Sequence, residues 1–278
     1  MVADWRGGWA ALTKAERNAA YDNNSAVADS PSLIAARNEA AQAYRARYPA
    51  GLDRAYGELP RQKWDLFPAD DVNAPTLVFI HGGYWQRNSR EDFAHLAEGI
   101  RAHGWAAALP SHTLAPEVSL SAIAEEINRA LDWLHDKGPS EGIAGGKIVL
   151  SGWSAGGHLT AHCLAHPAVT AGLAVSGVYE LGPIRDTGLN DNLKLTDEEL
   201  ARLSPLRQPV VQKPMSIAYG SLELPALVGD ARALHEKRAA AHAVGDLIPV
   251  AGANHFTILD ELQRPDGVLV KTVRALAG

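Results

Sequence analysis

A serine within a glycine-rich pentapeptide is the residue of this chain best suited to nucleophilic chemistry. Residues 152–156 read GWSAG, with Ser154 at the centre; an apolar run at 147–151 precedes them and helix-forming residues follow. A strand, a tight turn and a helix in this order are typical of a nucleophile elbow, in which a strained turn exposes the serine hydroxyl. The pentapeptide alone is weak evidence, so its chemical partners must come from elsewhere in the chain.

A glycine pair after an earlier apolar run could supply the donors that such a serine needs. Residues 78–85 read VFIHGGYW. Backbone N–H groups that turn toward one point stabilise the oxyanion that forms when a carbonyl is attacked. We expect these donors to be the N–H groups of Gly83, Tyr84 and Ala155, the residue after the serine. The alternative is that the glycines only shape a tight turn.

One histidine is placed to activate the serine. A serine hydroxyl is a poor nucleophile until a neighbouring imidazole removes its proton. His255 lies in the loop AGANHFT at 251–257, directly after the last strand that the sequence predicts. Most of the other histidines fall on predicted helices, so we predict His255 as the general base.

The acid that orients this histidine is expected between Ser154 and His255 in chain order. Two carboxylates follow the strand predicted over 215–219, Glu223 and Asp230. Glu223 lies in the loop four residues past the strand, whereas Asp230 lies at least one turn into a predicted helix. Loop position favours Glu223, and Asp230 is expected to be a solvated helix residue, although it stays the alternative acid.

Aromatic and histidine residues around these motifs suggest further roles. Trp85 and Trp153 flank the predicted site and could line a substrate pocket, or they could belong to the core. His158, His162 and His166 recur at a spacing that puts imidazoles on one helix face. No acidic ligand is interleaved and a serine mechanism requires no metal, so we expect neither a metal nor another cofactor.

The elements that position these residues alternate between strands and helices from residue 76 onward. The predicted strands are 76–80, 105–109, 147–150, 173–176, 215–219 and 247–250, and the predicted helices are about 90–102, 117–137, 155–166, 225–243 and 263–276. Such alternation indicates a mostly parallel sheet with helices on both faces. Ligands bind at the carboxyl ends of such strands, where Ser154 would lie.

The rest of the chain adds a helical start and one long connection. Helices are predicted over 9–22 and 31–48, the second with Ser30 as its cap and Pro31 at its first position. An antiparallel strand pair is predicted over 52–56 and 63–67. The long connection at 179–209 is predicted to be a lid-like excursion.

Length and composition limit the possible classes of protein. The 278 residues contain no long linker, which favours a single domain over 1–278 with an N-terminal helical segment at 1–50. A net charge of −6 without a basic cluster argues against nucleic acid, and no apolar run is long enough to span a membrane. The single Cys163 permits no internal disulfide, and no signal peptide is evident. We therefore expect a cytoplasmic protein, and a homodimer is plausible.

The combined motifs resemble a known family. Residues 81–85, 152–159, 220–223 and 254–256 are similar to those of α/β-hydrolases of the serine arylformamidase and hormone-sensitive-lipase-like esterase group. The resemblance implies an α/β-hydrolase fold with an eight-stranded sheet, a triad of Ser154, Glu223 and His255, and an oxyanion loop at Gly83 and Tyr84. Two departures affect substrate choice: Trp153 stands where relatives often have histidine, and the acid is Glu rather than the more frequent Asp.

Three functions follow from these motifs. The first two are hydrolysis of a small or aryl carboxylic ester and hydrolysis of an N-acyl or N-formyl aryl amide, both through an acyl-enzyme. The motifs do not separate these two, because the same residues serve both. The third is a non-catalytic small-molecule-binding protein on a hydrolase scaffold, against which the intact serine, acid and histidine argue.

Overall fold

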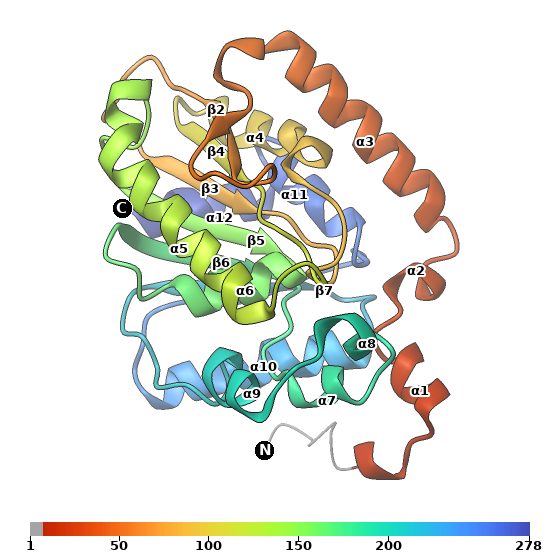
Figure 1. Cartoon of the computed structure of the whole chain (residues 1–278). Helices are drawn as coiled ribbons and strands as arrows, with labels where there is room; N and C mark the ends of the chain where they lie inside the picture. Colours follow the sequence, from red (N-terminus) through yellow and green to blue (C-terminus); the bar gives the residue numbers. More distant parts are fainter. Residues whose placement is uncertain (1–7) are drawn as a thin grey trace.

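An eight-stranded sheet forms the centre of the molecule (Figure 1). The computed structural model describes residues 8–278. The start of the chain, for which the sequence predicts no signal peptide, lies outside these residues. The strands are β1 (Arg54–Ala55), β2 (Lys63–Phe67), β3 (Thr76–Ile80), β4 (Ala106–Pro110), β5 (Ile148–Trp153), β6 (Val169–Val175), β7 (Met215–Gly220) and β8 (Leu247–Val250). Their order is β1-β2-β4-β3-β5-β6-β7-β8, with β1–β2 and β2–β4 antiparallel and the other pairs parallel. The predicted mostly parallel eight-stranded sheet is confirmed.

Helices surround this sheet and join its strands. The α-helices are α1 (Lys14–Ala19), α2 (Asn23–Ala26), α3 (Ser30–Arg47), α4 (Ala97–Arg101), α5 (Leu120–Lys137), α6 (Ala155–Cys163), α7 (Gly182–Arg185), α8 (Asn190–Leu193), α9 (Asp197–Leu203), α10 (Pro225–Ala240), α11 (Asp260–Gln263) and α12 (Val268–Ala277). Short 3-10 helices lie at η1 (Trp9–Ala11), η2 (Pro49–Gly51), η3 (Arg90–Asp92), η4 (Ala94–Leu96), η5 (Gly138–Glu141) and η6 (Thr257–Leu259). Helices α5, α6 and α10 cover one face of the sheet, and α4 and α12 cover the other (Figure 1).

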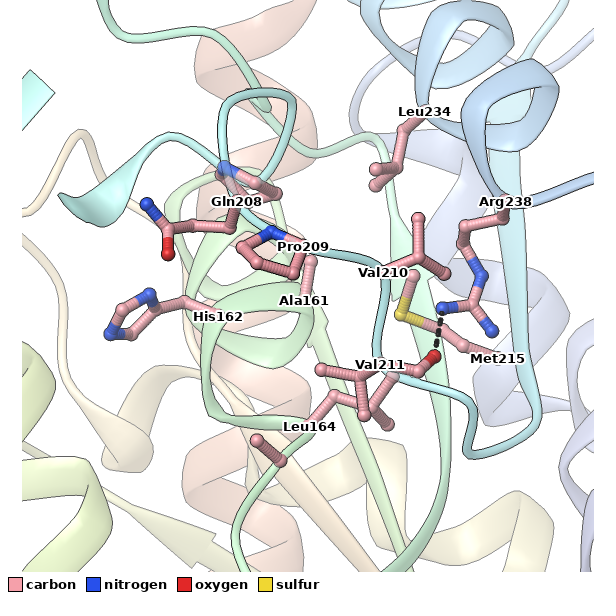
Figure 2. A pocket seen from close by; sticks show the side chains of 12 residues that line it. Ala161, His162, Leu164, Gln208, Pro209, Val210, Val211, Met215, Leu234 and Arg238 are labelled. Atoms are coloured by element: carbon pink, nitrogen blue, oxygen red, sulfur yellow. Dashed lines mark hydrogen bonds between the residues drawn. The ribbon is translucent and has the colours of Figure 1, made fainter. Parts of the chain in front are cut away.

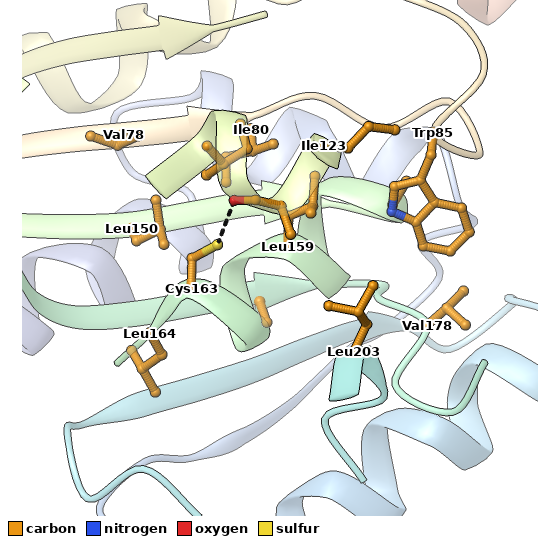
Figure 3. Packing of buried hydrophobic residues seen from close by; sticks show 14 of the residues in the cluster. Val78, Ile80, Trp85, Ile123, Leu150, Leu159, Cys163, Leu164, Val178 and Leu203 are labelled. Carbon is orange, nitrogen blue, oxygen red and sulfur yellow. Dashed lines mark hydrogen bonds between the residues drawn. The ribbon is translucent and has the colours of Figure 1, made fainter. Parts of the chain in front are cut away.

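The central strands are buried on both faces. Along β3, Val78 and Ile80 pack with α5 and α6 (Figure 3). Leu77 and Phe79 pack on the side of α4 and α12. This alternation is the period of two that a strand imposes on its side chains. Strands covered by helices on both faces consist of continuous apolar runs, which is why 76–80 is recognisable in the sequence.

The single cysteine belongs to this core. Cys163 is 2% exposed, and its Sγ lies 4.0 Å from the carbonyl of Ala124 (Figure 3). Burial raises the pKa of the thiol to about 12. A thiol that stays protonated at neutral pH is an inert packing group rather than a nucleophile.

The N-terminal segment differs from its prediction. The prediction of one helix over 9–22 is wrong, because the segment contains η1 and α1 and is interrupted before α2 begins at Asn23. Thr13 and Glu16 form a capping box that begins α1 at Lys14, and Asp22 caps α2 by accepting the N–H of Ser25 at 3.1 Å. Such caps satisfy the backbone N–H groups that have no intrahelical acceptor at the start of each helix.

The cap of α3 also differs from its prediction. Asp29 occupies the N-cap position, and Ser30 is the first helical residue. The hydroxyl of Ser30 donates instead to the carbonyl of Asn24 at 2.8 Å. This bond ties α3 to α2, so the serine serves the connection between the two helices.

The connection over 179–209 contains α7, α8 and α9 and contacts two distant segments. Gln86 donates from Nε2 to the carbonyl of Leu189 at 3.0 Å and accepts from Asn192 at 2.9 Å. Asn18 accepts the N–H of Gly188 at 2.8 Å, and Figure 1 shows α1 and α2 beside α8. That this excursion acts as a lid, and that 1–278 is one domain, stay predictions. Within residues 8–278, no helix has the length and apolar character that crossing a bilayer requires.

Candidate active site

Ser154 lies at a strained turn between β5 and α6. Its φ of 58° and ψ of −117° place a non-glycine residue in a left-handed conformation. The turn is held because the Ser154 N–H donates to the carbonyl of Val175 at 2.9 Å and its carbonyl accepts from His158 at 3.0 Å. A Cβ at Gly156 would lie 2.0 Å from the carbonyl oxygen of Ile80, so only glycine lets α6 pass this close to β3. The predicted strand-turn-helix context is present.

His255 and Glu223 form a buried pair. Nδ1 of His255 lies 3.2 Å from Oε2 of Glu223, and the two residues are 3% and 8% exposed. The loop after β7 brings Glu223 to the loop after β8, because these strands are parallel neighbours whose carboxyl ends share one edge. The structure thus brings together the predicted acid and the predicted base.

Ser176 is a partner of this pair that the sequence did not reveal. Its hydroxyl donates to Oε1 of Glu223 at 2.6 Å, and the N–H of Gly220 donates to the same oxygen at 2.7 Å. Ser176 is fully buried, has a φ of 51°, and is fixed by its own N–H to the carbonyl of Ala218 at 2.8 Å. A carboxylate with these two donors on one oxygen presents the other to His255 in a fixed orientation.

Trp153 supports the loop that carries His255. Its indole N–H donates to the carbonyl of His255 at 2.7 Å, and the two rings lie 4.6 Å apart. Trp153 is 3% exposed and also packs against Phe93 and Phe256. It lines the cavity described next, and its hydrogen bond and ring contact hold the loop that carries His255 in place.

Ser154 and His255 line one small cavity. Its volume is about 50 Å³, and Gly83, Tyr84 and Trp153 line it as well. The N-terminal helices close its mouth with residues that no sequence pattern singled out: Asn23, Asn24, Ile34 and Arg37. Within residues 8–278, no hydrogen bond links the Ser154 hydroxyl to His255, as is common before substrate tightens catalytic contacts.

The segment after β3 has the shape expected of an oxyanion loop. Gly83 has a φ of 123°, and Tyr84 and Trp85 follow at 56° and 59°. The carbonyl of Gly83 accepts from the N–H groups of Gln86 and Arg87, which closes the turn. Among residues 8–278, the N–H groups of Gly83 and Tyr84 have no hydrogen-bond acceptor, so they are open to a ligand in the cavity.

The side chain of Tyr84 ties this loop to the N-terminal segment. Its hydroxyl donates to the carbonyl of Tyr21 at 2.8 Å and accepts from the N–H and Nδ2 of Asn23 at 3.3 and 3.2 Å. Burial raises the pKa of Tyr84, which keeps the hydroxyl protonated and able to donate. Two consecutive left-handed non-glycine residues are strained, and this anchoring offsets part of that strain.

Trp85 packs in the core and is absent from the cavity lining. It is 1% exposed and packs among buried hydrophobic residues (Figure 3). Its ring meets that of His158 edge-on at 5.1 Å. We therefore leave Trp85 out of the site that we propose below.

Asp230 is not the solvated residue that its helical position predicted. It is fully buried, and its Oδ2 accepts the N–H groups of Tyr179 and Glu180 at 2.7 and 3.0 Å. The carboxylate therefore supports the chain that leaves β6. The position of Asp230 in a helix predicts exposure. Its side chain is buried instead, because two buried N–H groups require an acceptor.

The histidines of α6 and His166, just beyond the end of this helix, serve local contacts. Nε2 of His158 lies 2.8 Å from the carbonyl of Leu203, and His166 lies 3.0 Å from Asp132. In the described part of the chain, no three histidine, cysteine or acidic side chains are grouped so that they could hold a metal ion.

A larger cavity lies elsewhere and lacks the reactive groups. It measures about 340 Å³ and opens between α6, residues 205–211 and α10 (Figure 2). Its walls are mostly apolar, and Arg238 at its edge donates to the carbonyl of Val211 at 3.0 Å. It contains neither Ser154 nor His255, so size alone does not mark the candidate active site.

The sheet order, the elbow and the placement of these residues at the carboxyl edge define an α/β-hydrolase fold. A family model described as BD-FAE matches residues 66–168, which include the loop after β3 and the elbow. Kynurenine formamidase of Danio rerio is 24% identical over 248 residues, covering 82% of both chains. Esterase LipC of Mycobacterium tuberculosis is 25% identical over 240 residues, which covers 74% of this chain and 59% of that enzyme.

A solved structure is similar over almost the whole chain. A protein from Silicibacter sp. tm1040, described as a candidate thioesterase, is 28% identical and superposes with a TM-score of 0.84 over 93% of this chain and 99% of its own. The chain thus has an α/β-hydrolase fold and is similar to enzymes of the esterase and formamidase type.

Proposed function

We propose that the protein is a serine hydrolase that removes a small acyl group from an aryl ester or from an N-formyl or other N-acyl aryl amide. The buried pair of His255 and Glu223, whose histidine lines the same cavity as Ser154, carries this proposal. A carboxylate on Nδ1 holds the imidazole in the tautomer whose Nε2 accepts a proton. A binding protein would gain nothing from such an arrangement.

The reaction proceeds in two halves. His255 takes the proton of the Ser154 hydroxyl as Oγ attacks the substrate carbonyl, and the oxyanion that forms accepts hydrogen bonds from the N–H groups of Gly83, Tyr84 and Ala155. Collapse breaks the bond to the leaving group, which takes the proton from His255 and departs. Water then attacks the acyl-enzyme with the same histidine as base and releases the acid.

The size of the Ser154 cavity favours a small acyl group. Its volume is about 50 Å³, whereas a cavity needs about 10–15 Å³ on the same measure to hold one water molecule. A formyl or acetyl group fits such a space, but a long or branched acyl chain would require the N-terminal helices to move. The size therefore agrees with the names of the formamidase relatives.

The test is a ratio of rates. We would measure kcat/KM for N-formylkynurenine and for p-nitrophenyl acetate, with the Ser154→Ala variant as background. A ratio near or above one supports a formamidase, and ester turnover alone supports a carboxylesterase. Turnover of neither substrate would overturn the proposal and favour a small-molecule-binding protein. A cytoplasmic location and a homodimer stay predictions.

A further inference from the structure

A second cavity opens beside the Ser154 cavity where three segments of the chain meet. It measures about 250 Å³ and is lined by residues from the stretch 18–24, by Tyr84 and Arg87, and by residues 187–189. Asn24, Tyr84 and Arg87 line both cavities, so the two lie next to each other. We call this second space the junction cavity.

Hydrogen bonds join the three segments that line the junction cavity. Asn18 accepts the N–H of Gly188 at 2.8 Å, and Gln86, next to Arg87, donates to the carbonyl of Leu189 at 3.0 Å. The Tyr84 hydroxyl joins the oxyanion loop to Tyr21. Figure 1 shows the first two helices beside α8, in agreement with these bonds. A cavity with hydrogen-bonded walls is largely formed before a ligand arrives.

Arg87 offers a cation to this space. Its guanidinium lies over the ring of Tyr84 at 5.2 Å, and in the described part of the chain Arg87 forms no ion pair with a carboxylate. Asp22 is the one carboxylate among the lining residues, and it accepts from the N–H and hydroxyl of Ser25 at 3.1 and 2.6 Å. Asp22 attracts the guanidinium at longer range, but among residues 8–278 no carboxylate occupies its fork, which in a chain of net charge −6 suits a carboxylate ligand.

We propose that the junction cavity holds the leaving group of the substrate and that Arg87 selects leaving groups that carry a carboxylate. This inference rests on the proposed function, because the Ser154 cavity has room only for a small acyl group and the leaving group must occupy adjoining space. The junction cavity is larger than the roughly 150 Å³ that admits benzene in a protein interior, so it accommodates a substituted ring.

A cavity on the other side of the active site is less suited to an anion. It also measures about 250 Å³ and shares Ile34, Arg37 and Phe256 with the Ser154 cavity. Its arginine is engaged, because Arg37 donates from Nε and Nη2 to the side chain of Asn38 at 3.1 and 2.9 Å and lies over Phe93 at 4.3 Å. An occupied fork has fewer donors left for a carboxylate.

The test compares two acetate esters of equal shape. 4-Acetoxybenzoate carries a carboxylate, and 4-acetoxybenzamide carries a neutral amide in its place. The quantity measured is the ratio of their kcat/KM values, each corrected for spontaneous hydrolysis. We expect the wild type to favour the carboxylate by about tenfold, Arg87→Gln to lower the ratio to about one, and Arg87→Lys to give an intermediate ratio.

Controls separate this inference from the proposed function. Arg274→Gln removes the same charge from an exposed position on α12, so it should keep the wild-type ratio. An unchanged ratio in Arg87→Gln, or a ratio that falls in Arg37→Gln instead, would overturn the role of Arg87. Undiminished turnover in Ser154→Ala would instead overturn the proposed function itself.

Discussion

The hydroxyl of Ser176 donates a 2.6 Å hydrogen bond to Oε1 of Glu223, the carboxylate oxygen that faces away from His255. Ser176→Ala removes one of the two donors to this oxygen and leaves the N–H of Gly220 in place. A hydrogen bond to a charged group contributes about 1.5–3 kcal/mol, so we expect kcat to fall by about tenfold or more while KM changes little. Steady-state kinetics with p-nitrophenyl acetate measures the effect.

Ser151→Ala is the matched control for this substitution. Ser151 is also a fully buried serine of the sheet, and its hydroxyl donates to the carbonyl of Leu173 at 2.8 Å. Its loss should lower the free energy of unfolding without a selective effect on kcat. Equal kinetic effects of the two substitutions would contradict a positioning role for Ser176.

Tyr84→Phe tests the link between the N-terminal segment and the oxyanion loop. The substitution removes the hydroxyl that contacts Asn23 and Tyr21 but keeps the ring under Arg87. We expect kcat to fall by about threefold to tenfold, because the left-handed backbone at Tyr84 loses an anchor. A double-mutant cycle with Asn23→Ala should show strong coupling. Additive effects would mean that the two residues act independently.

With Glu223 rather than Asp230 as the acid, substitution of Glu223 should lower kcat, whereas substitution of Asp230 should lower stability. Glu223→Gln should lower kcat by about a thousandfold, because the amide no longer fixes the catalytic tautomer of His255. Asp230→Asn should cost about 1–3 kcal/mol of unfolding free energy at the Tyr179 and Glu180 contacts and leave kcat per folded molecule near wild type. Urea unfolding and active-site titration separate the two effects, and reversed results would reassign the acid.

Buried His112 makes stability depend on pH. Burial lowers its pKa from 6.5 to about 4, so between these values the unfolded chain binds a proton that the folded chain does not. Stability is therefore present above pH 6.5 and is lost as the pH falls toward 4, by about 2 kcal/mol at pH 5. We would measure the free energy of unfolding by urea at pH 7 and at pH 5. The loss of stability between these two pH values should be smaller by about this amount in His112→Asn than in the wild type. The same pH dependence in both proteins would contradict this.

Local sequence patterns predict the sheet and three residues at its carboxyl edge, Ser154, Glu223 and His255. Apolar runs such as 76–80 are recognisable because burial on both faces requires them. The sequence favours Glu223 as the acid because it lies in a loop. The pairing of β7 with β8 brings that loop to His255. Each of these inferences depends on residues that are close in sequence to a strand end.

Contacts between distant segments could not be predicted in this way. Ser176 was expected to end a strand, and nothing near it in the sequence indicates a bond to Glu223. Asn23 and Arg37 reach the Ser154 cavity because the N-terminal helices fold back over the sheet edge. Asp230 is buried because it accepts two N–H groups from a chain segment about 50 residues away.

Covalent trapping of the nucleophile tests the central claim most directly. A p-nitrophenyl alkylphosphonate transfers its phosphoryl group to an activated serine, with release of p-nitrophenol, and the adduct is located by mass spectrometry of peptides. We predict one adduct, on Ser154, in the wild type, none in Ser154→Ala, and much slower labelling in His255→Ala. Labelling at another residue, or equal labelling of the Ser154→Ala variant, would contradict the assignment of Ser154 as the nucleophile.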